Sequence, residues 1–224
     1  MSILAWRRMQ KAGKNAPSPD SMALNSLKQQ LLKLGSMVEE SAVLARSVLA
    51  IADMEAAPQI RSSDDKIDIL YHQLENSCTQ LLTDKSLSQK QVCEVLSYIH
   101  CVRDLERIGD YCKELAELGE RLLPSQPLPQ RDAILIMLDR CRSLLALALD
   151  CVSDDDGSAG AKLQNFDDLV DADYEQLLEK MMDPIPTSAQ AYEASLLLVL
   201  VLRCIERMAD HAVNVSQRVA RASK

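Results

Sequence analysis

The sequence predicts an all-α protein built from two tandem three-helix bundles. Its 224 residues include only 6 Gly and 8 Pro, while Leu and Ala are abundant, and this composition favours helices over turn-rich folds. Turn signals separate six stretches that are each long enough for a helix. Motifs of the first half recur about one hundred positions later in the same order, which indicates a duplicated unit.

Each expected helix lies between two turn signals such as NAPSPDS, LPSQPLP and DPIPTS. The six helices are expected over residues 21–55, 62–83, 88–122, 129–153, 164–182 and 187–221. In the third, apolar residues recur at intervals of three and four: Val95, Ile99, Val102, Leu105, Ile108, Cys112 and Leu115. Such a stripe is typical of a helix that packs on a core through one face. No alternating pattern of a β-strand competes with it.

The repeat is visible in every helix of the unit. In the first helix Met37 is matched by Met137, in the second DDKIDILYHQL by DDLVDADYEQL, and in the third CVRDLERIGDYC by VLRCIERMADHA. The offsets are 100, 103 and 100 residues, as expected if only loops changed length. We therefore predict a flexible tail over residues 1–20, a first unit over 21–123 and a second unit over 128–224.

The net charge and the cysteines limit the class of protein. A formal charge of -8 counts against nucleic-acid binding, which requires a basic surface. Seven Cys without a CxxC motif are typical of reduced thiols and indicate a cytoplasmic location. The longest apolar run, ASLLLVLVL, has about half of the roughly 20 residues that a membrane-spanning helix needs.

Four pairs of acidic residues, each four positions apart, recur in register in the two units. They are Asp64 and Asp68, Asp167 and Asp171, Glu106 and Asp110, and Glu206 and Asp210. This spacing puts both carboxylates of a pair on one face of a helix. Because like charges so placed destabilise a helix by roughly 0.2–0.5 kcal/mol, the four pairs require compensation.

Two explanations of the acidic pairs remain open at the level of sequence. The first is ion pairing on a solvated helix face with the neighbouring arginines, Arg103, Arg107, Arg203 and Arg207. The second is a cation bound between the second and third helices of each unit, with Glu39 or Asp139 adding a ligand from the first helix. An all-oxygen set of ligands suits Mg, Ca, Mn or ferric iron.

The sequence favours a binding or regulatory protein over an enzyme. It contains no GxGxxG, GxxxxGK[ST] or GxSxG motif, which argues against a nucleotide-binding loop and a hydrolase nucleophile. None of His72, His100 and His211 follows a Glu by three positions, as a ferritin-like di-iron centre would require. No nucleophile is grouped with a base and an orienting residue.

The duplicated motifs resemble those of a known family. RDLERIGDYC and RCIERMADHAVNVSQRV are similar to the hallmark third-helix motif of the PhoU family, usually LERIGDHAVNIAE. DDKID and DDLVD resemble the aspartate motif of its second helix, and LGSMVEESAVLA resembles its first. The likeness extends over nearly all of the chain from about Leu24, in both copies. Two residues depart from the family's pattern: Tyr111 stands where the family often has His, and Ala209 where it often has Gly. Tyr111 puts in doubt any role for a His beside the first site.

The resemblance implies two three-helix bundles related by a pseudo-twofold axis. It also implies multinuclear iron or zinc clusters, held by the ExxxD and DxxxD motifs. The oxygen ligands by themselves leave Mg or another hard divalent cation as the alternative. Transferred residue by residue, it nominates Asp64, Asp68, Glu106 and Asp110 for one metal site and Asp167, Asp171, Glu206 and Asp210 for the other.

The function implied by the resemblance is negative control of the phosphate response. Such a protein is a cytoplasmic adapter between a Pst-type phosphate ABC transporter and a PhoR-type sensor histidine kinase, and it also restrains phosphate uptake. It would be peripheral to the membrane only through these partners, and a monomer and a homodimer are both open. The alternatives are a metal-cluster storage or sensing protein and a helical scaffold without metal.

Overall fold

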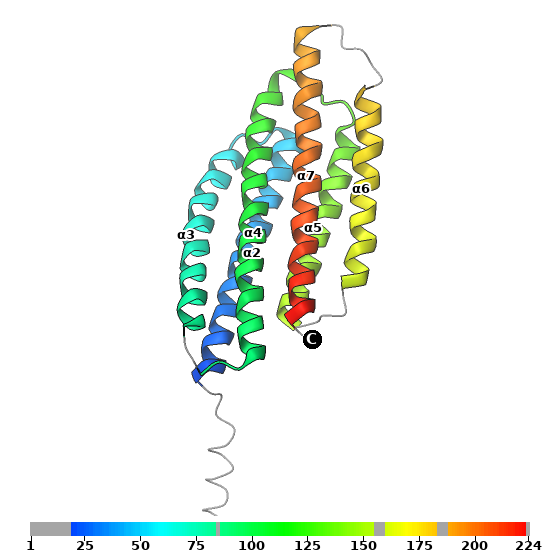
Figure 1. The fold of residues 1–224 in the computed structure, drawn as a ribbon. Coiled ribbons are helices and arrows are strands. Elements are labelled where there is room, and N and C mark those ends of the chain that lie inside the picture. Colours follow the sequence, from blue (N-terminus) through cyan, green and yellow to red (C-terminus); the bar gives the residue numbers. More distant parts are fainter. Residues whose placement is uncertain (1–18, 84–85, 155–159, 183–187, 223–224) are drawn as a thin grey trace, which may run out of the picture.

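The computed structural model describes residues 19–83, 86–154, 160–182 and 188–222. These residues form six α-helices and no strand (Figure 1), which confirms the all-α prediction. The helices are α2 (Pro19–Ile51), α3 (Ala56–Leu82), α4 (Gln89–Leu122), α5 (Arg131–Asp154), α6 (Gly160–Met182) and α7 (Ala189–Ala222), with a short 3-10 helix, η1 (Leu123–Ser125), between α4 and α5.

Among the helix boundaries, the start of α3 differs most from the prediction, and the end of α2 and the start of α6 each differ by four residues. α2 ends at Ile51 because Ala52 adopts a left-handed φ of 55°, which interrupts the helix. α3 begins at Ala56, six residues before the predicted start, and includes Pro58. Proline is tolerated in the first turn of a helix, where its missing N–H has no intrahelical partner.

A tail is predicted over residues 1–20, and residues 1–18 of it lie outside the described part of the chain. Pro19 and Asp20, which the prediction assigned to the tail, already form the first turn of α2. Proline at the first helical position and an acidic residue beside it both favour a helix start.

The six helices pack as two similar groups of three. In the first group α2, α3 and α4 contact one another, and in the second group α5, α6 and α7 do the same. Between the groups α4 packs against α7 and α2 against α5. Figure 1 shows α4 and α7 in front of α2 and α5, with α3 and α6 at the two outer edges. Every contact of the first group therefore has its counterpart in the second.

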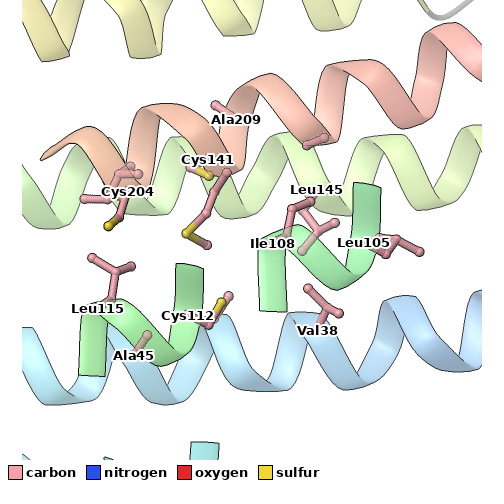
Figure 2. Packing of buried hydrophobic residues seen from close by; sticks show 14 of the residues in the cluster. Val38, Ala45, Leu105, Ile108, Cys112, Leu115, Cys141, Leu145, Cys204 and Ala209 are labelled. Carbon is pink, nitrogen blue, oxygen red and sulfur yellow. The ribbon is translucent and has the colours of Figure 1, made fainter. Parts of the chain in front are cut away.

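One continuous hydrophobic core joins both groups. Figure 2 shows aliphatic side chains such as Val38, Leu105 and Ile108 at its centre, together with Cys112 and Cys204. Burial raises the pKa of the Cys112 thiol well above its ordinary value, and a buried protonated thiol is inert. These thiols therefore pack as small hydrophobic side chains.

A close approach between α2 and α4 depends on a glycine. Gly119 is buried in α4, and a Cβ at this position would overlap the Cγ1 methyl of Val48 on α2. A residue without a side chain thus brings the two backbones together.

Polar side chains also connect the two groups of helices. Arg46 on α2 donates through Nε and Nη2 to both carboxylate oxygens of Asp139 on α5, at 2.7 and 2.9 Å. Between α4 and α7, Asp104 Oδ1 lies 2.9 Å from His211 Nδ1, and Arg218 Nε lies 3.7 Å from Asp104 Oδ2. Within the described ranges, no helix is both long and apolar enough to cross a membrane.

Candidate functional site: two carboxylate clusters

The first carboxylate cluster lies between α3 and α4. Asp64 and Asp68 come from α3, and Glu106 and Asp110 from α4, and these two helices pack against each other. Asp64 is only 3% exposed. Its Oδ2 accepts a hydrogen bond from Lys113 Nζ at 2.5 Å, so an ammonium group of the chain itself neutralises the most buried carboxylate.

An arginine bridges the two α4 carboxylates of this cluster. Arg107 Nη1 lies 2.9 Å from Asp110 Oδ2, and Arg107 Nε lies 3.5 Å from Glu106 Oε2. The pKa of Glu106 is nevertheless raised, first by burial and then by the charge of Asp110, with smaller contributions from Asp68 and Asp64. Because each carboxylate acts on the others, the structure brings the four predicted residues of the first site together.

The second cluster lies between α6 and α7. Asp167 and Asp171 come from α6, and Glu206 and Asp210 from α7. Arg207 repeats the role of Arg107, with Nη1 3.0 Å from Asp210 Oδ2 and Nε 3.3 Å from Glu206 Oε2. The four predicted residues of the second site are thus arranged on their two helices like those of the first.

Asp167 is the most perturbed carboxylate of the second cluster. It is 8% exposed, and burial, followed by the charges of Asp171 and Asp210, raises its pKa to about 6. Its Oδ2 accepts a hydrogen bond from Gln164 Nε2 at 3.3 Å. This neutral donor only partly offsets the cost of burying the charge.

The two clusters differ because the duplication is imperfect at one position. Lys113 neutralises Asp64 in the first unit, but the residue one hundred positions later is Val213. The second cluster therefore lacks the equivalent ammonium group at this position.

The residues fit a cation in their chemistry. Each cluster presents four carboxylates, and in each the Oδ1 atom of the buried aspartate, Asp64 or Asp167, has no hydrogen-bond partner among the described residues. A buried oxygen without a partner is costly, and a hard cation would supply one. With the side chains as they stand, no group of three or more His, Cys, Asp or Glu in the described part of the chain is placed to hold a metal ion. The carboxylates instead contact Lys113, Arg107 and Arg207.

Glu39 and Asp139 do not join these clusters. Both line a groove between α2 and α5, and Asp139 is engaged by Arg46 and by Arg142 Nη1, which lies 2.9 Å away. The prediction that the first helix adds a metal ligand is therefore not supported, because its carboxylate faces the other unit.

Sequence analysis missed Lys113, Asp104 and Arg46, which form the decisive contacts between helices. A signal was present, because each occupies a position where the two copies differ in chemical type. Lys113 is matched by Val213 and Asp104 by Cys204. Positions where a repeat loses its symmetry can therefore reveal pairings that conserved motifs do not show.

The fold and the clusters together define a class of protein: an all-helical protein with a duplicated three-helix unit and one acidic cluster in each copy. Two segments of the chain, residues 31–119 and 134–219, match the family model described as "PhoU domain". The chain therefore belongs to the PhoU family. The two segments lie within the predicted units, whose boundaries at 21–123 and 128–224 stay a prediction.

Known proteins are similar over most of this chain. A Synechocystis sp. protein called "Phosphate-specific transport system accessory protein PhoU homolog" is 34% identical over 198 residues, which cover 88% of each chain. The crystal structure of PhoU from Pseudomonas aeruginosa superimposes with a TM-score of 0.85 and 25% identity, covering 90% of this chain and 97% of that one. The PhoU structure from Streptococcus pneumoniae, at 24% identity and 91% and 96% coverage, shares the fold with a TM-score of 0.83.

Proposed function

We propose that this protein is an accessory regulator of phosphate transport. In this role it is a cytoplasmic, non-enzymatic adapter that links a Pst-type phosphate ABC transporter to a PhoR-type sensor kinase, silences the phosphate response when phosphate is plentiful and restrains uptake. The observation that carries the proposal is the similarity, over both copies of the unit, to relatives named as phosphate-specific transport system accessory proteins.

The carboxylate clusters suit a partner with basic surfaces. Glu106 and Asp110 on α4, and Glu206 and Asp210 on α7, are partly exposed, and α4 and α7 pack side by side. Two acidic patches on neighbouring helices would attract Lys and Arg of a partner, and such charge complementarity favours encounter and orientation. The adapter would therefore be peripheral to the membrane, and only through its partners.

Metal binding is a second candidate function, and the orphaned Oδ1 atoms of Asp64 and Asp167 favour it. The metal ligands would be Asp64, Asp68, Glu106 and Asp110 in the first unit, and Asp167, Asp171, Glu206 and Asp210 in the second. Iron or zinc as a multinuclear cluster, or Mg or another hard divalent cation, would neutralise the carboxylates and stiffen the two helix faces. A storage or sensing protein would bind the metal without any effect on phosphate signalling.

Deletion of the gene tests the regulatory role directly. We expect alkaline phosphatase activity in phosphate-rich medium to rise in the deletion strain and to fall again when the intact gene is returned. Unchanged activity, in a strain without a second homologous gene, would refute the regulatory role and leave metal binding as the leading function.

The same assay tests the clusters. We expect a protein with Glu106→Ala and Asp110→Ala to remain folded but to restore silence poorly. A matched control carries Asp132→Ala and Glu193→Ala, because these carboxylates are exposed and lie outside both clusters. Equal repression by both variants, at equal protein levels, would exclude the α4 carboxylates from the regulatory surface.

A further inference from the structure

A groove of about 510 Å³ lies between α2 and α5, helices that do not contribute to the carboxylate clusters. Its walls include Glu39, Glu40, Ala42, Asp139, Arg142 and Ala146. The groove is lined by the first helix of each unit, and these two helices pack against each other. The pseudo-symmetry of the chain therefore relates one end of the groove to the other.

In one half of this symmetric contact, Asp139 is already paired with two arginines. Arg46 holds both oxygens of Asp139, and Arg142 Nη1 lies 2.9 Å from Asp139 Oδ1. The hydrogen bond from Arg46, more than any other influence, lowers the pKa of Asp139. The α2–α5 contact thus accommodates a guanidinium group that donates two hydrogen bonds to one carboxylate.

The other end has the carboxylate but lacks both arginines. An offset of 100 residues relates Asp139 to Glu39, and it relates Arg46 to Ala146 and Arg142 to Ala42. Glu39 and the two alanines line the groove. Two arginine side chains of the symmetric arrangement are thus replaced by two methyl groups, which leaves open space beside Glu39.

Glu39 has no direct cationic partner among the described residues. It is half-buried, and among the described residues its carboxylate has no hydrogen bond or ion pair. Burial, followed by the charge of Asp150, raises its pKa, and the charge of Arg142 opposes this. An added positive charge at this point would therefore be favourable.

We propose that this end of the groove binds an arginine side chain of a partner protein, with the guanidinium on Glu39 in the position that Arg46 occupies on Asp139. Arginine fits better than lysine because its planar fork can bond both carboxylate oxygens. Its methylene stem can lie on the methyl groups of Ala42 and Ala146. The surroundings favour a cation, because Glu40 also lines the groove and the charge of Asp150 acts on Glu39, while Arg142 is paired with Asp139.

The inference goes beyond the proposed function, because it requires neither phosphate signalling nor a metal. It is tested on the purified full-length protein, whereas the proposed function is tested by reporter activity in cells. Failure of one therefore leaves the other intact.

The first experiment follows backbone amide shifts of the isotopically labelled protein during titration with the capped peptide acetyl-Gly-Arg-Gly-amide. We expect saturable shifts at residues 36–43 and 143–146, and about tenfold weaker binding of acetyl-Gly-Lys-Gly-amide, as a lost bidentate charge-assisted bond predicts. Glu39→Gln should abolish the response. Asp132→Asn, which removes an exposed carboxylate at the start of α5, should leave it unchanged.

Three results of this titration would overturn the proposal. The first is the absence of saturable shifts at these residues. The second is an equal response to the lysine peptide or in the Glu39→Gln protein. The third is tighter binding of free L-arginine than of the capped peptide, which would assign the groove to a small molecule.

A second experiment places the arginine within the chain. We expect Ala146→Arg to raise the urea midpoint of unfolding and to block the peptide, and we expect the rise in midpoint to disappear when Glu39→Gln is also present. The same change of midpoint in both backgrounds would contradict a Glu39–guanidinium pair. If Ala146→Arg does not fold, the titrations of the wild-type and Glu39→Gln proteins decide the question.

Discussion

The buried carboxylate of Asp167 predicts that Asp167→Asn stabilises the protein at neutral pH. Its folded-state pKa is about 6, above the ordinary value of 3.8. A raised pKa means that the contribution of this group to stability is complete below about pH 3.8 and is lost as the pH rises through about 6. Asparagine has nearly the same shape and does not ionise, so it avoids this loss.

The expected gain follows from the size of the pKa shift. One pKa unit corresponds to about 1.4 kcal/mol, so the ionised carboxylate destabilises the fold by up to about 3 kcal/mol. Because Asp167 lies beside other carboxylates that can relax, we expect a gain of about 1–3 kcal/mol for Asp167→Asn at about pH 7.5. At about pH 4, where the wild-type side chain is largely protonated, the gain should nearly disappear.

Urea unfolding in EDTA at both pH values measures this difference. The chelator is needed because a bound cation would also neutralise the cluster and mask the effect. Asp64→Asn is the matched comparison, since Lys113 already neutralises Asp64, and we expect no comparable gain from it. An equal gain at both pH values, or a loss of stability at about pH 7.5, would refute the assignment of a costly buried charge to Asp167.

Two further substitutions test the asymmetry of the clusters and the packing of the helices. Lys113→Val removes the ammonium group that pairs with Asp64 and introduces the residue found in the second unit, so we expect Mn²⁺ to bind the first cluster about tenfold more tightly, as measured by titration calorimetry. Lys33→Val is the control. Equal affinity of the Lys113→Val and Lys33→Val proteins would contradict competition between Lys113 and the metal. Gly119→Ala should lower the free energy of unfolding by about 1–3 kcal/mol through overpacking against Val48, although alanine at an exposed helical site would raise it by about 1 kcal/mol. A gain measured by urea unfolding would mean that α2 and α4 separate without cost.

Sequence patterns located the helices because the signals for a helix are local. Pro-free segments with apolar residues three and four positions apart predicted all six, and most boundaries lie within two residues of the observed ones. The start of α3 was the largest error. The predicted start at residue 62 left Pro58 outside the helix, because a proline in the first turn of a helix and one in a loop look alike in sequence.

The candidate site was predictable to the extent that it depends on helix geometry. A spacing of four residues puts Glu106 and Asp110 on one face of α4 whatever the rest of the chain does. The cation that pairs with a buried carboxylate could not be predicted from spacing along one helix. Lys113 reaches Asp64 from another helix, 49 positions along the chain, and its distance depends on how α3 and α4 are packed.

The sequence by itself determined the six helices, the duplication, the eight motif carboxylates and the family, because each rests on short-range periodicity or on repeated motifs. Only the tertiary structure decided which carboxylates are compensated. Among the described residues, it pairs Asp64 with Lys113 but gives Asp167 no ion pair, and it pairs Asp139 with Arg46 but gives Glu39 none. The physical reason is that an ion pair between helices requires both side chains to reach one point in space, and interhelical packing, not the spacing along either helix, sets that point.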